Sequence, residues 1–166
     1  MTESGFRRFA DFYSTHSRAL WRYLVRIGAD RTLAEDLGQE AFLRWSLSPA
    51  ASWDEERARA YLFAIATRLL TDWWRRQRLH SAWEALYEPD PAAEIADSPL
   101  FRSQAWASLT RRQQQLLWLA YVEEFSHSEI AGICGVAPAS VRVLLSRGRA
   151  LLAKSLTDDQ KDPAHG

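Results

Sequence analysis

The side chains best suited to chemistry in this sequence are basic ones near its C-terminal end. From Pro138 to Lys154 there are four basic residues and no carboxylate, in a chain whose formal net charge is zero. Such a local excess of positive charge attracts phosphates whatever the net charge of the whole chain. The ordinary alternative is a solvated helix face, because arginine is mostly an exposed residue. The first hypothesis is therefore nucleic-acid binding by this stretch.

Two predicted helices position these basic residues. Ser126 and Glu129 form a capping box, which predicts a helix start at Ser126. Gly135 suits the left-handed conformation that ends many helices, and Pro138 suits the first turn of the next one. The second helix keeps an apolar stripe on one side, at Val141, Leu145, Gly148 and Leu152. A helix-turn-helix with a basic outer face can enter a major groove, although capped helix pairs also occur in proteins that bind no DNA.

A second candidate surface lies on a helix predicted over 33–47, opened by a capping box at Thr32 and Glu35. Its buried stripe is Ala34, Leu37, Ala41 and Trp45. The opposite side carries an acidic and amide patch that ends in a leucine: Asp36, Gln39, Glu40 and Leu43. This patch is either a solvated face or a surface that docks a protein, and periodicity does not decide between them.

A third candidate surface lies on a long helix predicted over 57–78. One side combines aromatic and charged residues, and a tryptophan precedes it in a loop: Trp53, Tyr61, Arg68, Asp72, Arg75 and Arg76. Aromatic rings interleaved with arginines suit unstacked bases and a single-stranded backbone. Arginines near a helix C-terminus also complement the helix dipole, which is the simpler explanation.

The remaining elements complete an all-α fold. Helices are predicted over 6–27 and 100–109. A further helix is predicted to begin at the capping box of Thr110 and Gln113 and to precede the helix-turn-helix. Prolines and carboxylates mark an acidic linker over 81–99. We expect two small helical domains, 1–80 and 100–156, with a polar tail over 157–166.

Several classes of protein are not expected. The single cysteine, Cys134, excludes an internal disulfide and is predicted to be a small buried apolar residue. The histidines and Cys134 show no metal-ligand spacing, so we expect neither metal nor cofactor. Without a nucleophile–base pair or a phosphate-cradling glycine loop, no enzyme and no catalytic residue are expected. No apolar run approaches the ~20 residues of a membrane span. The N-terminus also lacks a signal peptide's apolar segment, so a cytoplasmic protein is expected.

Three stretches, in this order, are similar to one known family. They are DLGQEAFLRW at 36–45, RAYLFAIATRLLTDWWRR at 59–76, and LTRRQQQLLWLAYVEEFSHSEIAGICGVAPASVRVLLSRGRALL at 109–152. Over about residues 6–155 the chain resembles an extracytoplasmic-function (ECF) sigma factor, from the small two-domain group of the bacterial sigma-70 family. The resemblance implies a protein that directs core RNA polymerase to promoters, helps to open the DNA, and is held by an anti-sigma factor.

The resemblance also implies a role for each surface. The helix at 33–47 would dock on the clamp coiled coil of the largest polymerase subunit through Asp36, Gln39, Glu40 and Leu43. The long helix and its loop would bind the minus-10 element through Trp53, Tyr61, Arg68, Asp72, Arg75 and Arg76. The second helix of the helix-turn-helix would bind the minus-35 element through Ser140, Arg142, Val143, Ser146 and Arg147.

Some positions depart from the family pattern. Arg68 stands where many members have asparagine, and Val143 with Leu144 replaces a common small-polar and basic pair. Leu144 lies beside the apolar stripe and can widen it, whereas valine can pack against a thymine methyl. Ala137 replaces the usual serine cap, a local loss of about 1 kcal/mol. Two alternatives stay open: a stand-alone helix-turn-helix regulator, and a degenerate sigma-like protein that binds polymerase without reading DNA.

Overall fold

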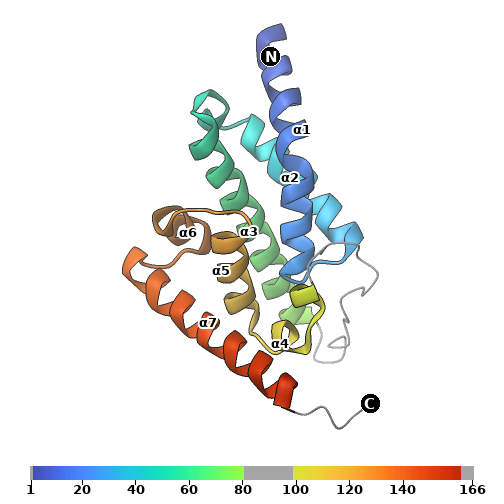
Figure 1. The fold of residues 1–166 in the computed structure, drawn as a ribbon. Helices are drawn as coiled ribbons and strands as arrows, with labels where there is room; N and C mark the ends of the chain where they lie inside the picture. The colour runs from blue at the N-terminus through green and yellow to red at the C-terminus, as the bar shows by residue number, and fades with distance from the viewer. Residues whose placement is uncertain (1, 81–98, 162–166) are drawn as a thin grey trace. The chain divides into compact units, whose positions relative to one another are not determined.

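The computed structural model describes residues 2–80 and 99–161, and every regular element in these ranges is a helix (Figure 1). The predicted all-α class is confirmed. The contacts divide the chain into two units, Met1–Ala93 and Glu94–Gly166. The predicted linker lies outside the described residues except for Pro99.

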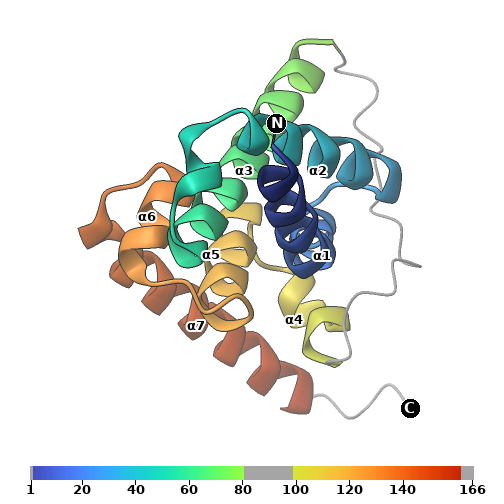
Figure 2. The same cartoon turned by 90° about the horizontal axis from the view of Figure 1, so that it is seen from above.

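The first unit is built from three long helices and one short one: α1 (Glu3–Arg26), α2 (Arg31–Ser46), η1 (Pro49–Ser52) and α3 (Glu55–His80). Each long helix packs against the other two (Figure 2). Leu20, Ala41 and Leu62, one from each long helix, are buried in the shared core. Phe12 stacks on Trp45, with ring centroids 4.0 Å apart and planes at 4°. This aromatic pair fixes α1 against α2, because parallel rings bury a large apolar area.

The helix starts in this unit differ from the predicted ones. The helix α1 begins at Glu3 rather than residue 6, with Thr2 as its N-cap. The capping box predicted at Thr32 was wrong, because the carboxylate of Asp30 accepts the Leu33 N–H at 2.7 Å and caps α2. Aspartate and threonine are both good N-caps, so the sequence did not separate the two positions.

The second unit contains five helices among its described residues: η2 (Pro99–Arg102), α4 (Gln104–Ala107), α5 (Arg111–Tyr121), α6 (His127–Cys134) and α7 (Pro138–Lys161). The capping boxes predicted at Thr110 and Ser126 are both present. The single helix predicted over 100–109 was wrong, because the Ser103 hydroxyl accepts the Trp106 N–H and starts a new helix. The tail predicted from residue 157 is helical through Lys161.

Some residues predicted for the hydrophobic core lie nearer the surface. Trp45 is buried as predicted, and Trp106 and Trp118 are buried too, whereas Trp21 and Trp73 are only half-buried although they lie in apolar helical patterns. Cys134 is also half-buried, and Ile133 beside it occupies the core position. Burial nevertheless raises the pKa of the Cys134 thiol to about 11, so the thiol stays protonated at neutral pH.

Within the part of the chain that the structure describes, no single helix is long and apolar enough to cross a membrane. One pair of consecutive helices, His127–Cys134 and Pro138–Asp158, is long and apolar enough when the two are taken together, but the pair is bent by 95°.

Candidate nucleic-acid interface

The α2 face, defined as Asp36, Gln39, Glu40 and Leu43, lies on the side of α2 away from the hydrophobic core. The buried residues Ala34 and Ala41 fix this orientation. Asp36 and Gln39 are exposed, and Leu43 is 54 % exposed. The Glu40 carboxylate accepts a hydrogen bond from Arg44 Nε at 2.7 Å. The structure therefore brings all four predicted docking residues onto one accessible surface.

A groove that the sequence did not reveal runs beside the α2 face. It has a volume of about 290 Å³ and lies between α1 and α2, lined by Tyr13, Ser17, Arg18, Trp21, Ala34, Glu35, Gly38, Gln39 and Phe42. Gln39 belongs both to the groove and to the α2 face. Two aromatic residues of the lining, Tyr13 and Trp21, are not buried in the core but lie at the edge of the helix pair.

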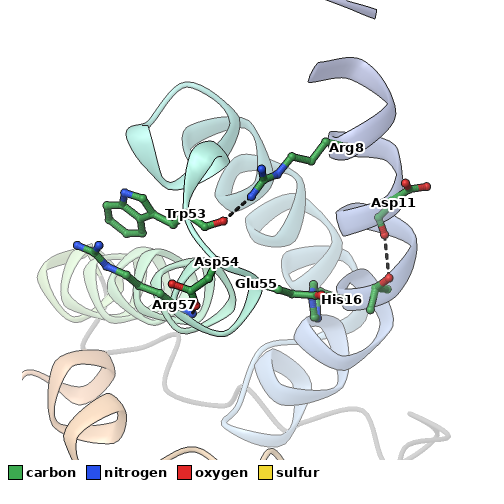
Figure 3. A network of polar contacts seen from close by, with 8 residues as sticks. Arg8, Asp11, His16, Trp53, Asp54, Glu55 and Arg57 are labelled. Carbon is green, nitrogen blue, oxygen red and sulfur yellow. Dashed lines mark hydrogen bonds and ion pairs between the residues drawn. The ribbon is translucent and has the colours of Figure 1, made fainter. Parts of the chain in front are cut away.

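The Trp53 cluster, defined as Trp53, Arg57 and Tyr61, forms where α3 begins. Trp53 follows η1, and its ring lies 5.3 Å from the Tyr61 ring in an edge-on arrangement. The guanidinium carbon of Arg57 lies 3.9 Å from the centroid of the Trp53 ring, a cation–π contact. Figure 3 shows Arg57 beside the indole. A base that stacks on that face of Trp53 must therefore take the place of Arg57.

Arg57 was not among the predicted site residues. Its signal in the sequence is its spacing, since Arg57 and Tyr61 are four residues apart and Trp53 precedes Arg57 by four. Residues three or four apart share a helix face, but Trp53 lies before the helix, so the contact depends on the path of the loop. The structure thus adds one arginine to the candidate minus-10 surface.

Two contacts from α1 hold this loop and the start of α3. Arg8 Nη2 donates a hydrogen bond to the Trp53 carbonyl. His16 is buried in α1, and its Nε2 lies 3.1 Å from Glu55 Oε1, at the first turn of α3 (Figure 3). Burial lowers the pKa of His16, and hydrogen bonding to Glu55 partly opposes that shift. The Asp54 carboxylate accepts the Arg57 N–H at 3.0 Å and caps the helix.

The other predicted minus-10 residues extend along α3. Tyr61, Arg68 and Arg75 follow one another at steps of seven, which places them on one side of the helix, and all three are exposed. Asp72 is half-buried on the same side, with an oxygen 3.6 Å from Arg75 Nη1. Arg76 is exposed but lies about 100° around the helix from Arg75, so it does not share that line.

The helix-turn-helix consists of α6 and α7. Gly135 between them has φ 67°, the left-handed conformation predicted for it. The 95° bend between the two helices lies within the roughly 90–120° typical of this motif. Val141 and Leu145 are buried, and a Cβ on Gly148 would lie 3.4 Å from Leu117 of α5. These contacts fix the rotation of α7 against α5.

The fixed rotation of α7 exposes most of the predicted minus-35 residues. Arg142, Val143, Ser146 and Arg147 are exposed, whereas Ser140 is half-buried at the edge of the surface. Leu144 is half-buried beside the core stripe. The structure therefore presents four of the five predicted residues outward from one helix.

Two hydrogen bonds that the sequence did not reveal hold this motif. Arg149 Nη1 of α7 donates to the Tyr121 hydroxyl at 2.8 Å, and Tyr121 is exposed at the end of α5. Arg112 Nη1 donates to the Cys134 carbonyl at 2.9 Å, satisfying a carbonyl at the end of α6. Neither pair shows in the sequence, because the partners are 28 and 22 residues apart.

Comparison with known proteins agrees with this architecture. The family model of sigma-70 region 2 matches residues 12–80, and that of sigma-70 region 4 matches residues 103–152. The chain is 30% identical over 139 residues to the ECF RNA polymerase sigma factor SigL of Mycobacterium tuberculosis, covering 78% of each chain. It is 26% identical over 162 residues to the RNA polymerase sigma factor YlaC of Bacillus subtilis, covering 92% of this chain and 94% of that one.

The fold is shared with solved structures, among them two complexes. One is the sigma factor RpoE of Bartonella quintana in complex with the anti-sigma factor NepR, with a TM-score of 0.69, 20% identity, and coverage of 90% of this chain and 96% of that one. The other is CnrH in complex with the cytosolic domain of CnrY, with a TM-score of 0.63, 23% identity, and coverage of 91% and 88%.

Two helical units, the first matching region 2 and the second carrying a helix-turn-helix that matches region 4, define a sigma-70 type of transcription factor. The chain belongs to the ECF group of the sigma-70 family and is an RNA polymerase sigma factor. The alternative of a stand-alone regulator is not supported, since the region 2 match spans most of the N-terminal unit.

Proposed function

We propose that this sigma factor acts by binding alone. It docks on core polymerase, places its two units on the minus-10 and minus-35 elements, and captures unstacked bases of the opened strand, without catalysing a reaction itself. The Trp53 cluster carries the proposal, because it puts two aromatic rings and an arginine on the region 2 unit. We place the protein in the cytoplasm, where core polymerase works.

The α2 face is the proposed contact with the clamp coiled coil of the largest polymerase subunit. Its carboxylates are suited to basic partner residues, and Leu43 supplies an exposed apolar group beside them. Glu40 already pairs with Arg44 on the surface, so docking exchanges one exposed ion pair for another. The specificity of docking then depends on Asp36, Gln39 and Leu43 as much as on charge.

The Trp53 cluster and the line Tyr61–Arg68–Arg75 are the proposed minus-10 surface. Stacking on an aromatic ring repays about 1–3 kcal/mol per base, comparable with the few kcal/mol that unstacking costs. Arg68 and Arg75 follow along the same side of α3, where they can hold the phosphates of the displaced strand. Asp72 lies beside Arg75, which orients that guanidinium but weakens its attraction for phosphate. Arg76 is proposed as a separate phosphate contact.

The exposed face of α7 is the proposed minus-35 surface. Arg142 and Arg147 contact phosphates or guanine edges, and Ser146 supplies a hydroxyl. Ser140 lies at the edge, where the backbone of the DNA passes. An anti-sigma factor is also proposed as a partner, since one neighbour of the same fold is bound to such a protein.

The test is transcription in vitro with purified core polymerase and a pool of genomic fragments, with and without this protein, followed by mapping of the start sites. We expect new starts that share a pair of upstream elements. Binding to core polymerase without any new start would instead support a degenerate sigma-like protein. Binding to neither core polymerase nor promoter DNA would refute the proposed function.

A further inference from the structure

The outer face of α7 has an apolar side chain at its centre. Val143 is 47 % exposed, while Val141 and Leu145 on the same helix are buried. At 3.6 residues per turn Val143 lies about 160° around the helix from each of them. It therefore stands in the middle of the surface that α7 turns away from α5.

The charged residues of α7 lie to the side of Val143 or beyond it. Arg142 is about 100° around the helix from Val143, and Arg147 lies one turn further along. Arg149 is held by the Tyr121 hydroxyl. The exposed residues three or four positions from Val143, on its own side of the helix, are Ala139, Ser146 and Arg147. Among these three, Arg147 alone carries a charge.

The N-terminal residues of a recognition helix are those that reach the base edges. Those edges in the major groove present hydrogen-bond donors and acceptors, and the one apolar group among them is the C5-methyl of thymine. Valine has no polar atom, so over any other edge it would displace water without replacing its hydrogen bonds, which is costly. Over a C5-methyl group it buries apolar surface on both sides.

We propose that Val143 reads the C5-methyl of a thymine, so that the minus-35 element of this sigma factor carries a T·A pair beneath the centre of α7. The inference rests on the proposed function, and it adds which base feature the helix recognises. Arg142, at the side of the same surface, contacts phosphate and sets the register. Sequence discrimination at this position is therefore apolar and independent of salt, whereas affinity from the arginines falls as salt rises.

The test uses holoenzyme assembled from core polymerase and the full chain, on synthetic promoters taken from the mapped starts. Each thymine of the minus-35 element, on either strand, is replaced in turn by deoxyuridine, which lacks only the methyl group. We expect one thymine at which the replacement weakens binding about four-fold, the value for one buried methyl group. With Val143→Ser the same replacement should have no effect.

Controls separate this role from a general loss of binding. Leu151→Ala changes an exposed apolar residue of the same helix, 45 % exposed but further from its N-terminus, and should keep the deoxyuridine effect. Val143→Thr retains one methyl group of the side chain and should keep part of the deoxyuridine effect. At the sensitive position, 5-methylcytosine should bind more tightly than cytosine. A promoter active only when it contains 5-methylcytosine would show that thymine is not the target.

The outcomes distinguish this inference from the proposed function. If starts are mapped but no thymine responds to deoxyuridine, the sigma assignment stands and the role of Val143 is wrong. The same holds if the deoxyuridine effect is equal in the wild type and in Val143→Ser. If no start is obtained, the proposed function fails, and the inference fails with it because there is no element to read.

Discussion

Replacement of Trp53 by alanine tests the minus-10 surface most directly. Stacking on an aromatic ring contributes about 1–3 kcal/mol per base. A base on the covered face must first displace Arg57, whose cation–π contact is worth about 0.5–1 kcal/mol at an exposed site. The middle values, about 2 and about 0.75 kcal/mol, leave a net contribution of Trp53 of about 1.25 kcal/mol, or roughly eight-fold in affinity. We expect Trp53→Ala to weaken binding of the non-template strand by that factor.

The assay is fluorescence anisotropy of holoenzyme with a labelled single strand that carries the minus-10 element. Trp53→Phe keeps a ring and should retain most of the affinity, whereas Trp53→Leu keeps apolar volume without a π face and should behave like Trp53→Ala. Circular dichroism and core binding verify that each variant folds. Wild-type affinity in both Trp53→Ala and Trp53→Leu would refute stacking on this residue.

Three further changes test the other surfaces. Arg142→Ala should reduce use of a mapped promoter and lower the slope of log affinity against log salt by about one, as expected for one lost phosphate contact; an unchanged slope would assign Arg142 to base reading instead. Asp36→Ala combined with Glu40→Ala should lower affinity for core polymerase while the melting temperature hardly changes, since both side chains are accessible; normal co-purification with core polymerase would contradict the docking role. His16→Gln should make the melting temperature less sensitive to acid. Burial lowers the pKa of His16 in the folded state below its usual 6.5, so the unfolded chain binds the extra proton and wild-type stability falls as the pH drops below about 6.5. An equal loss of stability between pH 7.5 and 5 in both proteins would show that His16 is not responsible.

The fold was predictable from the sequence where local rules act alone. The capping boxes at Thr110 and Ser126 are satisfied within four residues, and Gly135 adopts the conformation that its lack of a Cβ permits. Local sequence rules were insufficient where two residues could each be the N-cap of the same helix. Asp30 and Thr32 are both good caps, and the outcome depends on the turn that follows Gly28.

The candidate surfaces were predicted less completely, because their details are tertiary. Helical periodicity correctly separated Asp36 and Leu43 from the buried side of α2, but it gave no sign of the groove beside them. The shape of the groove depends on how far Trp21 of α1 reaches toward α2. Side-chain packing between the two helices decides this, and the spacing of residues along one helix does not show it. The prediction also placed Arg75 and Arg76 on one side of α3. Consecutive residues lie about 100° apart around a helix, so these two side chains point in different directions.

Three contacts that the sequence did not reveal hold parts of the proposed binding surfaces and of the helix-turn-helix in place. Arg8 fixes the backbone at Trp53, His16 fixes the first turn of α3, and Tyr121 holds Arg149. Ordering a side chain during binding costs about 0.5–1.5 kcal/mol of binding free energy. A side chain that is already held in the free protein avoids most of this cost. Arg57 is different, because it occupies one face of Trp53 and must leave before a base can stack there. In the proposed minus-10 surface, the backbone at Trp53 is therefore held by Arg8 while Arg57 covers one face of the ring. We expect that weak stacking by an incorrect base would not repay the removal of Arg57.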